Sequence, residues 1–307
     1  MSTEATAAPV VRRRGDVVFA GLARGAGITI LVALAGVALF LTLESIPAIT
    51  TPADESDGGN IILYVWPLLF GTLLAAALAI LVAAPLSIAL ALVISHYAPR
   101  RLAKPIGYAV DLLAAVPSVV YGLWGINFLA PRLYDVYAWL ASNLGWLPFF
   151  EGPPSGRSIL TASIVLAIMA LPIITAICRE IFAQTPTLHQ EAALALGATR
   201  WEMIRMTVFP YGRSGIVSAI MLGLGRALGE TMAVAMVLSA TGVITFNLIS
   251  SVNPSTIAAN IALKFPEATG VDVNVLIFSG LVLFLVTFIV NFLGRAIAGR
   301  GVVKGAR

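Results

Sequence analysis

The sequence contains little charge. Of its 307 residues, 11% are Asp, Glu, Lys or Arg, whereas a typical soluble domain has about 25%. Hydrophobic residues make up 59% of the chain, and the mean hydropathy is +0.95. Because such a chain has too few polar side chains to cover a water-exposed surface, the composition argues against a soluble domain and indicates a protein that lies in lipid.

Residues that build metal and nucleophilic sites are also scarce. Cys178 is the single cysteine, so the sequence excludes an intrachain disulfide and a cysteine metal cluster. His96 and His189 have no partners at metal-ligand spacing, and there is no Ser-His or His-based constellation. We therefore predict a protein without enzymatic activity and without a metal or other cofactor of its own.

Nucleotide-binding motifs are absent as well. The chain contains no G-x-x-x-x-G-K-S/T, and Gly223-Leu-Gly225-Arg-Ala-Leu-Gly229 does not match the dinucleotide fingerprint. The net charge of +4 is not arranged as a basic stripe with interleaved aromatics, which argues against nucleic acid. Any ATP and Mg²⁺ that the protein depends on must therefore be bound by another chain.

Long apolar runs recur along the sequence. A helix needs about 20 residues to cross a hydrocarbon core about 30 Å thick. We predict an all-α, polytopic membrane protein with six transmembrane helices, at 22–43, 63–95, 106–130, 158–182, 214–241 and 275–294. Together they form one membrane domain, 22–294, between a basic N-terminal segment, 1–21, and a basic tail, 295–307.

The basic residues predict the orientation of these helices, because Lys and Arg accumulate in cytoplasmic loops. With the N-terminus inside, Arg132, Arg157 and Lys264 lie outside and Arg226 lies within a span. The other fifteen of the 19 basic residues are then cytoplasmic: Arg12, Arg13, Arg14, Arg24, Arg100, Arg101, Lys104, Arg179, Arg200, Arg205, Arg213, Arg295, Arg300, Lys304 and Arg307. We therefore expect both termini in the cytoplasm.

The predicted outer loops are 44–62, 131–157 and 242–274. The loop 131–157 is rich in Tyr, Trp and Phe, which suits either anchoring at the lipid headgroups or docking of an extracytoplasmic partner. The loop 242–274 contains several asparagines and prolines, so we expect a mixture of short helices and turns there.

The inner loop 184–212 predicts two short helices joined by a turn. Thr185 before Pro186 is a good N-cap and first-turn pair, and Thr187 with Gln190 offers a competing capping box. Gly197 suits the left-handed position that ends the first helix. Such a helix–turn–helix is a mechanical part that another protein's groove can hold.

The second helix of this loop also has local signals. Thr199 with Glu202 predicts a capping box at its start, and we expect Pro210 to end it.

The loop resembles the EAA loop of bacterial ABC importer permeases, which has the pattern E-A-A-x3-G-x9-I-x-L-P. The matching residues are Glu191, Ala192, Ala193, Gly197 and Pro210. Thr207 and Phe209 depart from the pattern. The resemblance implies that the loop docks in a cleft of a separate ATPase subunit, with the short helix as coupling element and Gly197 permitting the turn.

A charged pair lies within the fifth predicted span. Arg226 and Glu230 are four residues apart, which places them on one face of a continuous helix. An arginine near the bilayer centre costs about 2.5–3.5 kcal/mol on insertion scales, so such residues usually face a pathway. The planar set of donors on a guanidinium matches the oxygens of a tetrahedral oxyanion. A neighbouring carboxylate can accept a hydrogen bond from the P–OH group of hydrogen phosphate, whereas it repels sulfate, which carries no proton at neutral pH. The alternative is an internal salt bridge that neutralises both charges.

Two segments resemble the permeases of bacterial phosphate importers. They are Arg226-Ala-Leu-Gly-Glu-Thr-Met232 and Ala115-Val-Pro-Ser-Val-Val-Tyr-Gly122, and their combination is similar to the PstC type in preference to its PstA partner. This resemblance implies roles in translocation for Arg226, Glu230 and Thr231. Ser118 and Tyr121 could supply hydroxyls to the anion, although such residues in spans often bond to the backbone instead.

The resemblance also implies partners: a PstA-like second permease, a PstB-like ATPase dimer and a PstS-like extracytoplasmic phosphate-binding protein, at the plasma membrane. One alternative is an importer for another oxyanion, such as molybdate or sulfate. A second is an ATP-independent secondary transporter, which would show inverted half-repeats; residues 1–150 hold no second EAA-like or Arg-x-x-Gly-Glu segment.

Overall fold

The computed structural model describes residues 14–51 and 60–300. Over these ranges the chain is helical, with no strand and two isolated β-bridges, which confirms the all-α prediction. The predictions for 1–13, 52–59 and 301–307, including the positions of Arg12, Arg13, Lys304 and Arg307, lie outside the described residues.

Among the described residues, four helices are long and apolar enough to cross a membrane. They are α1 (Arg14–Thr50), α2 (Ile61–Leu92), α6 (Ile159–Ala183) and α12 (Val271–Arg300). A π-helical turn, η2 (Val93–Tyr97), extends α2. These helices correspond to four of the six predicted spans. α1, α2 with η2, and α12 are longer than the predicted spans because helical backbone continues past the apolar runs, whereas α6 has the predicted length.

The third predicted span is broken in the structure. Helix α3 (Arg100–Ala114) ends before Pro117, and α4 (Ser118–Trp124), η3 (Gly125–Leu129) and α5 (Ala130–Leu144) follow at a bend of 94°. Proline lacks an amide proton and keeps the residue before it out of the helical region, so a straight helix over 106–130 was the wrong expectation. Helix α5 occupies much of the predicted outer loop 131–157.

The fifth predicted span is broken as well. Helix α9 (Phe209–Gly229) ends at Gly229, and the short α10 (Met232–Val237) begins two residues after Glu230. Two arginines and several glycines lower the hydropathy of α9 below that of the four long helices. Within 14–51 and 60–300 there are thus four candidate spans, or five when the bent pair counts as one, against the six predicted.

Helix α6 lies at the centre of the bundle, in contact with α2, α3, α9 and α10. The alanines of α2 that are buried in this core are Ala75, Ala76, Ala79, Ala83 and Ala91. Small side chains let helices approach closely where no hydrophobic force drives them together, as in lipid. The close approach allows Ser87 Oγ on α2 to donate to the Leu171 carbonyl of α6 at 3.1 Å.

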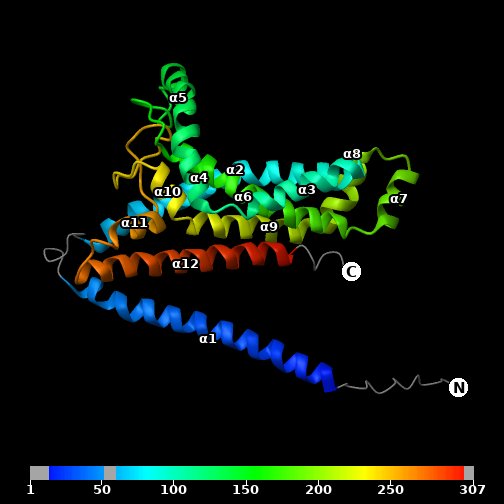
Figure 1. The fold of residues 1–307 in the computed structure, drawn as a ribbon, viewed down its shortest axis with the longest axis horizontal. Coiled ribbons are helices and arrows are strands. Elements are labelled where there is room, and N and C mark those ends of the chain that lie inside the picture. Colours follow the sequence, from blue (N-terminus) through cyan, green and yellow to red (C-terminus); the bar gives the residue numbers. More distant parts are fainter. Residues whose placement is uncertain (1–13, 52–59, 301–307) are drawn as a thin grey trace.

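Helix α1 lies at the edge of the molecule. It packs on α12 and diverges from the bundle toward its Arg14 end (Figure 1). Asn274 Nδ2 donates to the Glu44 carbonyl at 2.7 Å where the two helices meet. Most of the large apolar side chains of α1 are exposed, for example Phe19 and Leu31, as expected of a helix that faces lipid.

The helices place distinct elements at the two ends of the molecule. Helices α7 (Thr187–Ala195) and α8 (Arg200–Met203) lie at one end, and α5, α10 and α11 (Ile257–Lys264) lie at the other (Figure 1). The Arg14 end of α1 and the Arg300 end of α12 point toward the α7–α8 end. Helix α1 therefore begins, and helix α12 ends, on the side of the predicted coupling loop.

The opposite end contains an irregular segment, 238–256, organised by one asparagine. Asn253 is fully buried, and its Oδ1 accepts a hydrogen bond from the Ile159 amide at 3.0 Å. Its Nδ2 donates to the carbonyls of Arg157, Ser239 and Ser250 at 3.0–3.2 Å. With α11 following, the prediction of short helices and turns in 242–274 is confirmed.

Candidate functional site: the coupling loop and the α9–α10 break

The first helix of the coupling loop begins one residue later than predicted. Helix α7 starts at Thr187, with Pro186 at the N-cap and no side-chain cap, so neither the Thr185 cap nor the Thr187–Gln190 box forms. Instead, Gln190 Nε2 donates to the Thr185 carbonyl at 3.1 Å. This bond ties the first turn of α7 to the end of α6.

The turn after α7 has the predicted geometry. Gly197 has φ +87°, in the left-handed region. Its amide donates to the Leu194 carbonyl at 3.0 Å, and the Ala198 amide donates to the Ala193 carbonyl at 3.2 Å. This pair of bonds is the Schellman motif, which satisfies the last carbonyls of a helix and requires a residue that tolerates positive φ.

The predicted capping box at the start of α8 is present. Glu202 Oε2 accepts from the Thr199 amide at 2.8 Å, and Thr199 Oγ1 accepts from the Glu202 amide at 3.3 Å. Hydrogen bonds from the backbone and the hydroxyl of Thr199 hold the pKa of the Glu202 carboxyl below its ordinary value, because they stabilise the ionised form. The loop therefore has a fixed conformation on both sides of Gly197.

Pro210 does not end the second helix, contrary to the prediction. The chain passes from α8 through a π-helical turn, η4 (Ile204–Val208), directly into α9, where Pro210 lies in the first turn. The Phe209 amide bonds to the Ile204 carbonyl in the wider π turn. Pro210 has no amide proton to donate, and the widened turn before it lets the backbone stay helical without that hydrogen bond. The helical run therefore continues from Arg200 to Gly229.

The coupling loop presents an apolar surface. Leu188 and Leu196 are 75% and 89% exposed, and Trp201 is 54% exposed. Glu191, Ala192 and Gly197 are also exposed, whereas Ala193 is buried against the rest of the chain. Apolar side chains raised on a rigid helix–turn–helix beyond the bundle are what a partner's groove can bury.

The break between α9 and α10 comes directly after the predicted charged pair. Glu230 is the C-cap of α9, with φ −71° and ψ 128°, so the chain leaves the helical conformation after it, and the i,i+4 spacing of Arg226 and Glu230 falls at the end of α9. Glu230 is buried, and its Oε1 accepts from the Ala233 amide at 3.3 Å, at the start of α10. In the described part of the chain the recorded ion pair is Arg179 with Asp111, so the internal salt bridge is not observed.

Arg226 remains available for a ligand. Its Nε is buried and has no hydrogen-bond partner among the described residues. The residue lines a cavity of about 660 Å³ between α6, α9 and α12, together with Ser218, Asn291 and Arg295. A buried guanidinium nitrogen without a partner costs free energy, of the order of 1–3 kcal/mol, which an oxyanion would recover.

Comparison with known proteins identifies the chain. Residues 83–300 match the family described as the binding-protein-dependent transport system inner membrane component. The chain belongs to this permease family. It is therefore a permease subunit of an ABC importer and not an enzyme, and its helices make it a multi-pass membrane protein.

Several curated permeases are similar over nearly their whole length. The chain is 46% identical over 308 residues to "Phosphate transport system permease protein PstC 2" of Mycobacterium tuberculosis, covering 95% of this chain and 94% of the relative. It is 40% identical over 298 residues to PstC of Mesorhizobium japonicum, covering 91% and 89%. The sequence-based resemblance to the PstC type is thus confirmed.

A solved structure shows the same fold. An inward-facing form of the MetNI methionine ABC transporter matches with a TM-score of 0.53 at 16% identity, covering 78% of this chain and 95% of that one. This likeness supports the importer permease fold.

The remaining predicted site residues of the permease lie around the helix breaks. Tyr121 is buried on α4, which packs on α10. Its hydroxyl donates to the Leu113 carbonyl at 2.8 Å, as hydroxyls in spans often do. Ser118 is half-buried at the start of α4, and Thr231 Oγ1 donates to the Gly229 carbonyl at 3.2 Å.

Sequence reasoning missed two polar groups of the permease. Arg295 and Asn291 line the Arg226 cavity from α12, but they are 65 or more positions away in the chain and only packing brings them close. Asp111 pairs with Arg179 of α6 at 3.2 Å, a contact between residues 68 positions apart in the chain. In the sequence, Arg179 and Arg295 serve only as basic residues that indicate membrane orientation.

Proposed function

We propose that this permease forms half of a pathway that imports inorganic phosphate across the plasma membrane, driven by ATP hydrolysis on separate subunits. The observation that carries the proposal is the buried Nε of Arg226, which has no hydrogen-bond partner among the described residues and belongs to a residue on the wall of the cavity between α6, α9 and α12. The similar proteins named phosphate transport system permeases support phosphate as the cargo.

Arg226 and Glu230 have complementary chemistry toward this cargo. The guanidinium stays charged at any physiological pH and offers a planar set of donors to phosphate oxygens. Glu230, held at the start of α10, can accept the proton of hydrogen phosphate, whereas sulfate has no proton to offer at neutral pH. Both residues are proposed to contact the anion, with Ser118, Tyr121 and Thr231 close to the two helix breaks.

The coupling loop is proposed to dock in a cleft of a PstB-like ATPase dimer that holds ATP and Mg²⁺. Its exposed Leu188, Leu196 and Trp201 supply the apolar contact, and Glu191 to Pro210 supply the family pattern. Closure of the ATPases would move α7 and α8, and η4 would pass the movement to α9 and Arg226 along one helical run.

The remaining assembly follows from this docking. We place the α7–α8 end in the cytoplasm, with both termini, in agreement with the distribution of basic residues. The opposite end, with α5 and the segment 238–256, would receive phosphate from a PstS-like binding protein. A PstA-like permease would supply the other half of the pathway.

Uptake of labelled phosphate by cells that depend on this transporter tests the proposal. We expect Arg226→Ala to lower uptake by at least about tenfold, which corresponds to the loss of one charge-assisted hydrogen bond. Arg226→Lys should retain part of the uptake, because it keeps the charge but loses the planar fork. Arg213→Ala is the matched control: it removes an exposed arginine of the same helix that does not line the cavity.

Normal phosphate uptake by Arg226→Ala would contradict the anion site. Uptake of molybdate or sulfate in place of phosphate by the wild type would assign the importer to another oxyanion.

A further inference from the structure

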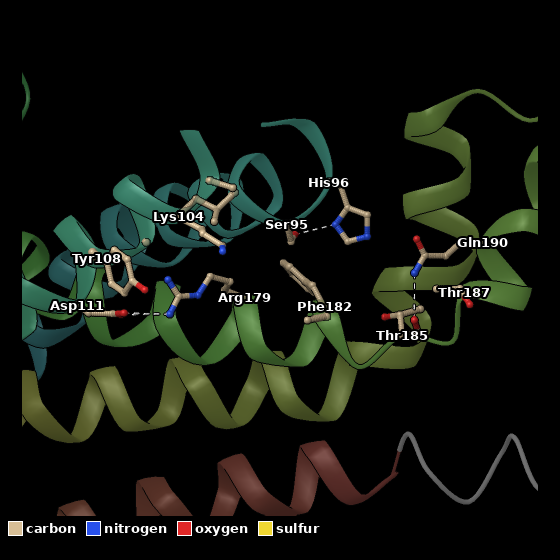
Figure 2. A pocket seen from close by; sticks show the side chains of 14 residues that line it. Ser95, His96, Lys104, Tyr108, Asp111, Arg179, Phe182, Thr185, Thr187 and Gln190 are labelled. Atoms are coloured by element: carbon tan, nitrogen blue, oxygen red, sulfur yellow. Dashed lines mark hydrogen bonds and ion pairs between the residues drawn. The ribbon is translucent and has the colours of Figure 1, made fainter. Parts of the chain in front are cut away.

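A second polar pocket lies at the base of the coupling loop, apart from the Arg226 cavity. It has a volume of about 480 Å³ and lies between α3, η2, α6 and the start of α7 (Figure 2). Its polar lining residues are Ser95, His96, Lys104, Tyr108, Asp111, Arg179, Thr185, Thr187 and Gln190. None of the translocation residues proposed above lines this pocket.

The charged side chains that line this pocket are Lys104, Arg179 and Asp111, and together they carry a net positive charge. Arg179 Nη2 donates to both oxygens of Asp111 at 3.2 Å, which offsets the only carboxylate in the lining. Lys104 has no ion-pair partner in the part of the chain that the structure describes, and its amine is directed toward the Arg179 side chain (Figure 2). Two cations that face each other across a pocket repel unless an anion lies between them.

Close packing holds Arg179 in this position. A Cβ at Gly107 of α3 would collide with Arg179 Nη1, so the glycine allows the guanidinium to lie against α3. The cationic side of the pocket is thus built from two helices, α3 and α6.

The other side of the pocket contains an unused donor. Thr185 is 3% exposed, and its Oγ1 has no hydrogen-bond partner among the described residues. Its backbone groups are used: the amide donates to the Phe182 carbonyl at 3.3 Å, and the carbonyl accepts from Gln190 at 3.1 Å. A buried hydroxyl without a partner costs about 1–3 kcal/mol, so a ligand with an oxygen at this end would be favoured.

An apolar track on α3 leads away from the cations. Lys104, Tyr108 and Leu112 follow one another at four-residue intervals, so they form a stripe along the helix. Tyr108 and Leu112 are 68% and 71% exposed. Charge at one end of a helix stripe and exposed apolar side chains beyond it match a phospholipid, whose headgroup is anionic and whose chains are apolar.

We propose that this pocket binds the headgroup of an anionic phospholipid. The phosphate lies between Lys104 and Arg179, a headgroup hydroxyl reaches Thr185, and an acyl chain follows Tyr108 and Leu112. The pocket is larger than one phosphate needs, which favours a headgroup with a polyol extension over the free anion. A bound lipid would join α3 and α6 to the residue that precedes α7, and would thereby stiffen the base of the coupling loop.

The inference rests on the proposed function only for the cytoplasmic placement of this end. It is tested with the full chain, purified in mild detergent with its co-purifying subunits. Native mass spectrometry measures retention of added phosphatidylglycerol and, for comparison, phosphatidylcholine. The combined substitution Lys104→Gln and Thr185→Val should weaken phosphatidylglycerol binding by at least about tenfold and leave phosphatidylcholine unchanged.

Two further variants separate binding from misfolding. Lys104→Arg with Thr185→Ser keeps the charge and the hydroxyl, so it should retain the lipid. Arg101→Gln removes an exposed charge from the same helix outside the pocket, and should also retain it. Equal loss of phosphatidylglycerol in Arg101→Gln would overturn the pocket as the site.

A second arm distinguishes the two sources of phosphate. Equilibrium dialysis with inorganic phosphate, in an Arg226→Gln background, measures binding away from the proposed translocation site. Loss of this binding on Lys104→Gln, with lipid retention unchanged, would overturn the lipid and assign the pocket to the free anion. If neither the retention of phosphatidylglycerol nor the binding of inorganic phosphate depends on Lys104 and Thr185, the pocket is not the site. Phosphate uptake tests the proposed function separately.

Discussion

The Glu230 carboxylate accepts a hydrogen bond from the Ala233 amide at 3.3 Å, across the break between α9 and α10. The carboxylate therefore occupies the positive end of the α10 backbone dipoles. Glu230 caps α10 directly after α9 ends at Gly229, and Arg226 lies four residues earlier, in the last turn of α9. The described part of the chain records no ion pair between the two residues.

Substitution of Glu230 should separate these two roles. Glu230→Ala removes the cap and the charge, and should lower the apparent unfolding free energy by about 1 kcal/mol and abolish most phosphate uptake. Glu230→Gln keeps an oxygen acceptor for Ala233, so it should lose uptake with little change in thermal stability. Equal destabilisation by both variants would indicate a structural role alone.

The capping box of α8 should make the coupling loop sensitive to acid. Because the folded pKa of Glu202 lies below its ordinary value, its contribution is fully present above the ordinary pKa and is lost as the pH falls through the folded one. Hydrogen exchange at the amides of Thr199 and Glu202 should therefore lose protection at acid pH beyond the intrinsic trend. Glu202→Gln should show no such step, and a step that persists in this variant would point to another group.

Substitution of Gly197 should disturb coupling more than folding. With φ +87°, Gly197→Ala places an L side chain in the left-handed region, at a cost of about 1–2 kcal/mol to the local turn. We expect weaker co-purification of the ATPase and reduced uptake, with a smaller loss for Gly197→Asn.

Gly36→Ala is the matched control for this experiment. Gly36 lies within α1 with open space around it, so an added methyl group should be neutral or stabilising. Loss of ATPase binding in both variants would argue against a special role of the turn.

Removal of the Asn253 side chain should destabilise the opposite end of the molecule. Asn253→Ala leaves the Ile159 amide and three carbonyls without their buried partner, which should cost about 3 kcal/mol or more. The measurement is the thermal stability of the purified permease. Asn143→Ala, which removes an exposed amide bonded within its own helix region, should have almost no effect.

Local signals account for the parts of the fold that sequence reasoning predicted. The Schellman turn at Gly197 and the capping box of Thr199 and Glu202 involve residues at most five positions apart, and their chemistry does not depend on what packs around them. The four long helices follow from continuous apolar runs, because a backbone in lipid must satisfy its hydrogen bonds within the helix.

Other features could not be predicted because local signals allow more than one outcome or because distant contacts decide them. Pro210 is a helix-ending signal by local rules, yet a π turn before it lets the helix continue. Thr185 is a good cap by type, but the bond from Gln190 goes to its carbonyl and the hydroxyl stays unused. Asp111 pairs with Arg179, 68 positions away, and not with nearby Lys104.

The sequence by itself determined that this protein lies in a membrane, that it lacks a P-loop motif, and that a helix–turn–helix segment leads into a helix with an arginine in an apolar run. These conclusions depend on composition and on short-range spacing. Only the tertiary structure decided that the helix breaks at Glu230 and that Arg226 faces a cavity shared with α12. The reason is that a helix break is stable only where neighbouring elements supply the hydrogen bonds and packing that the broken helix gives up.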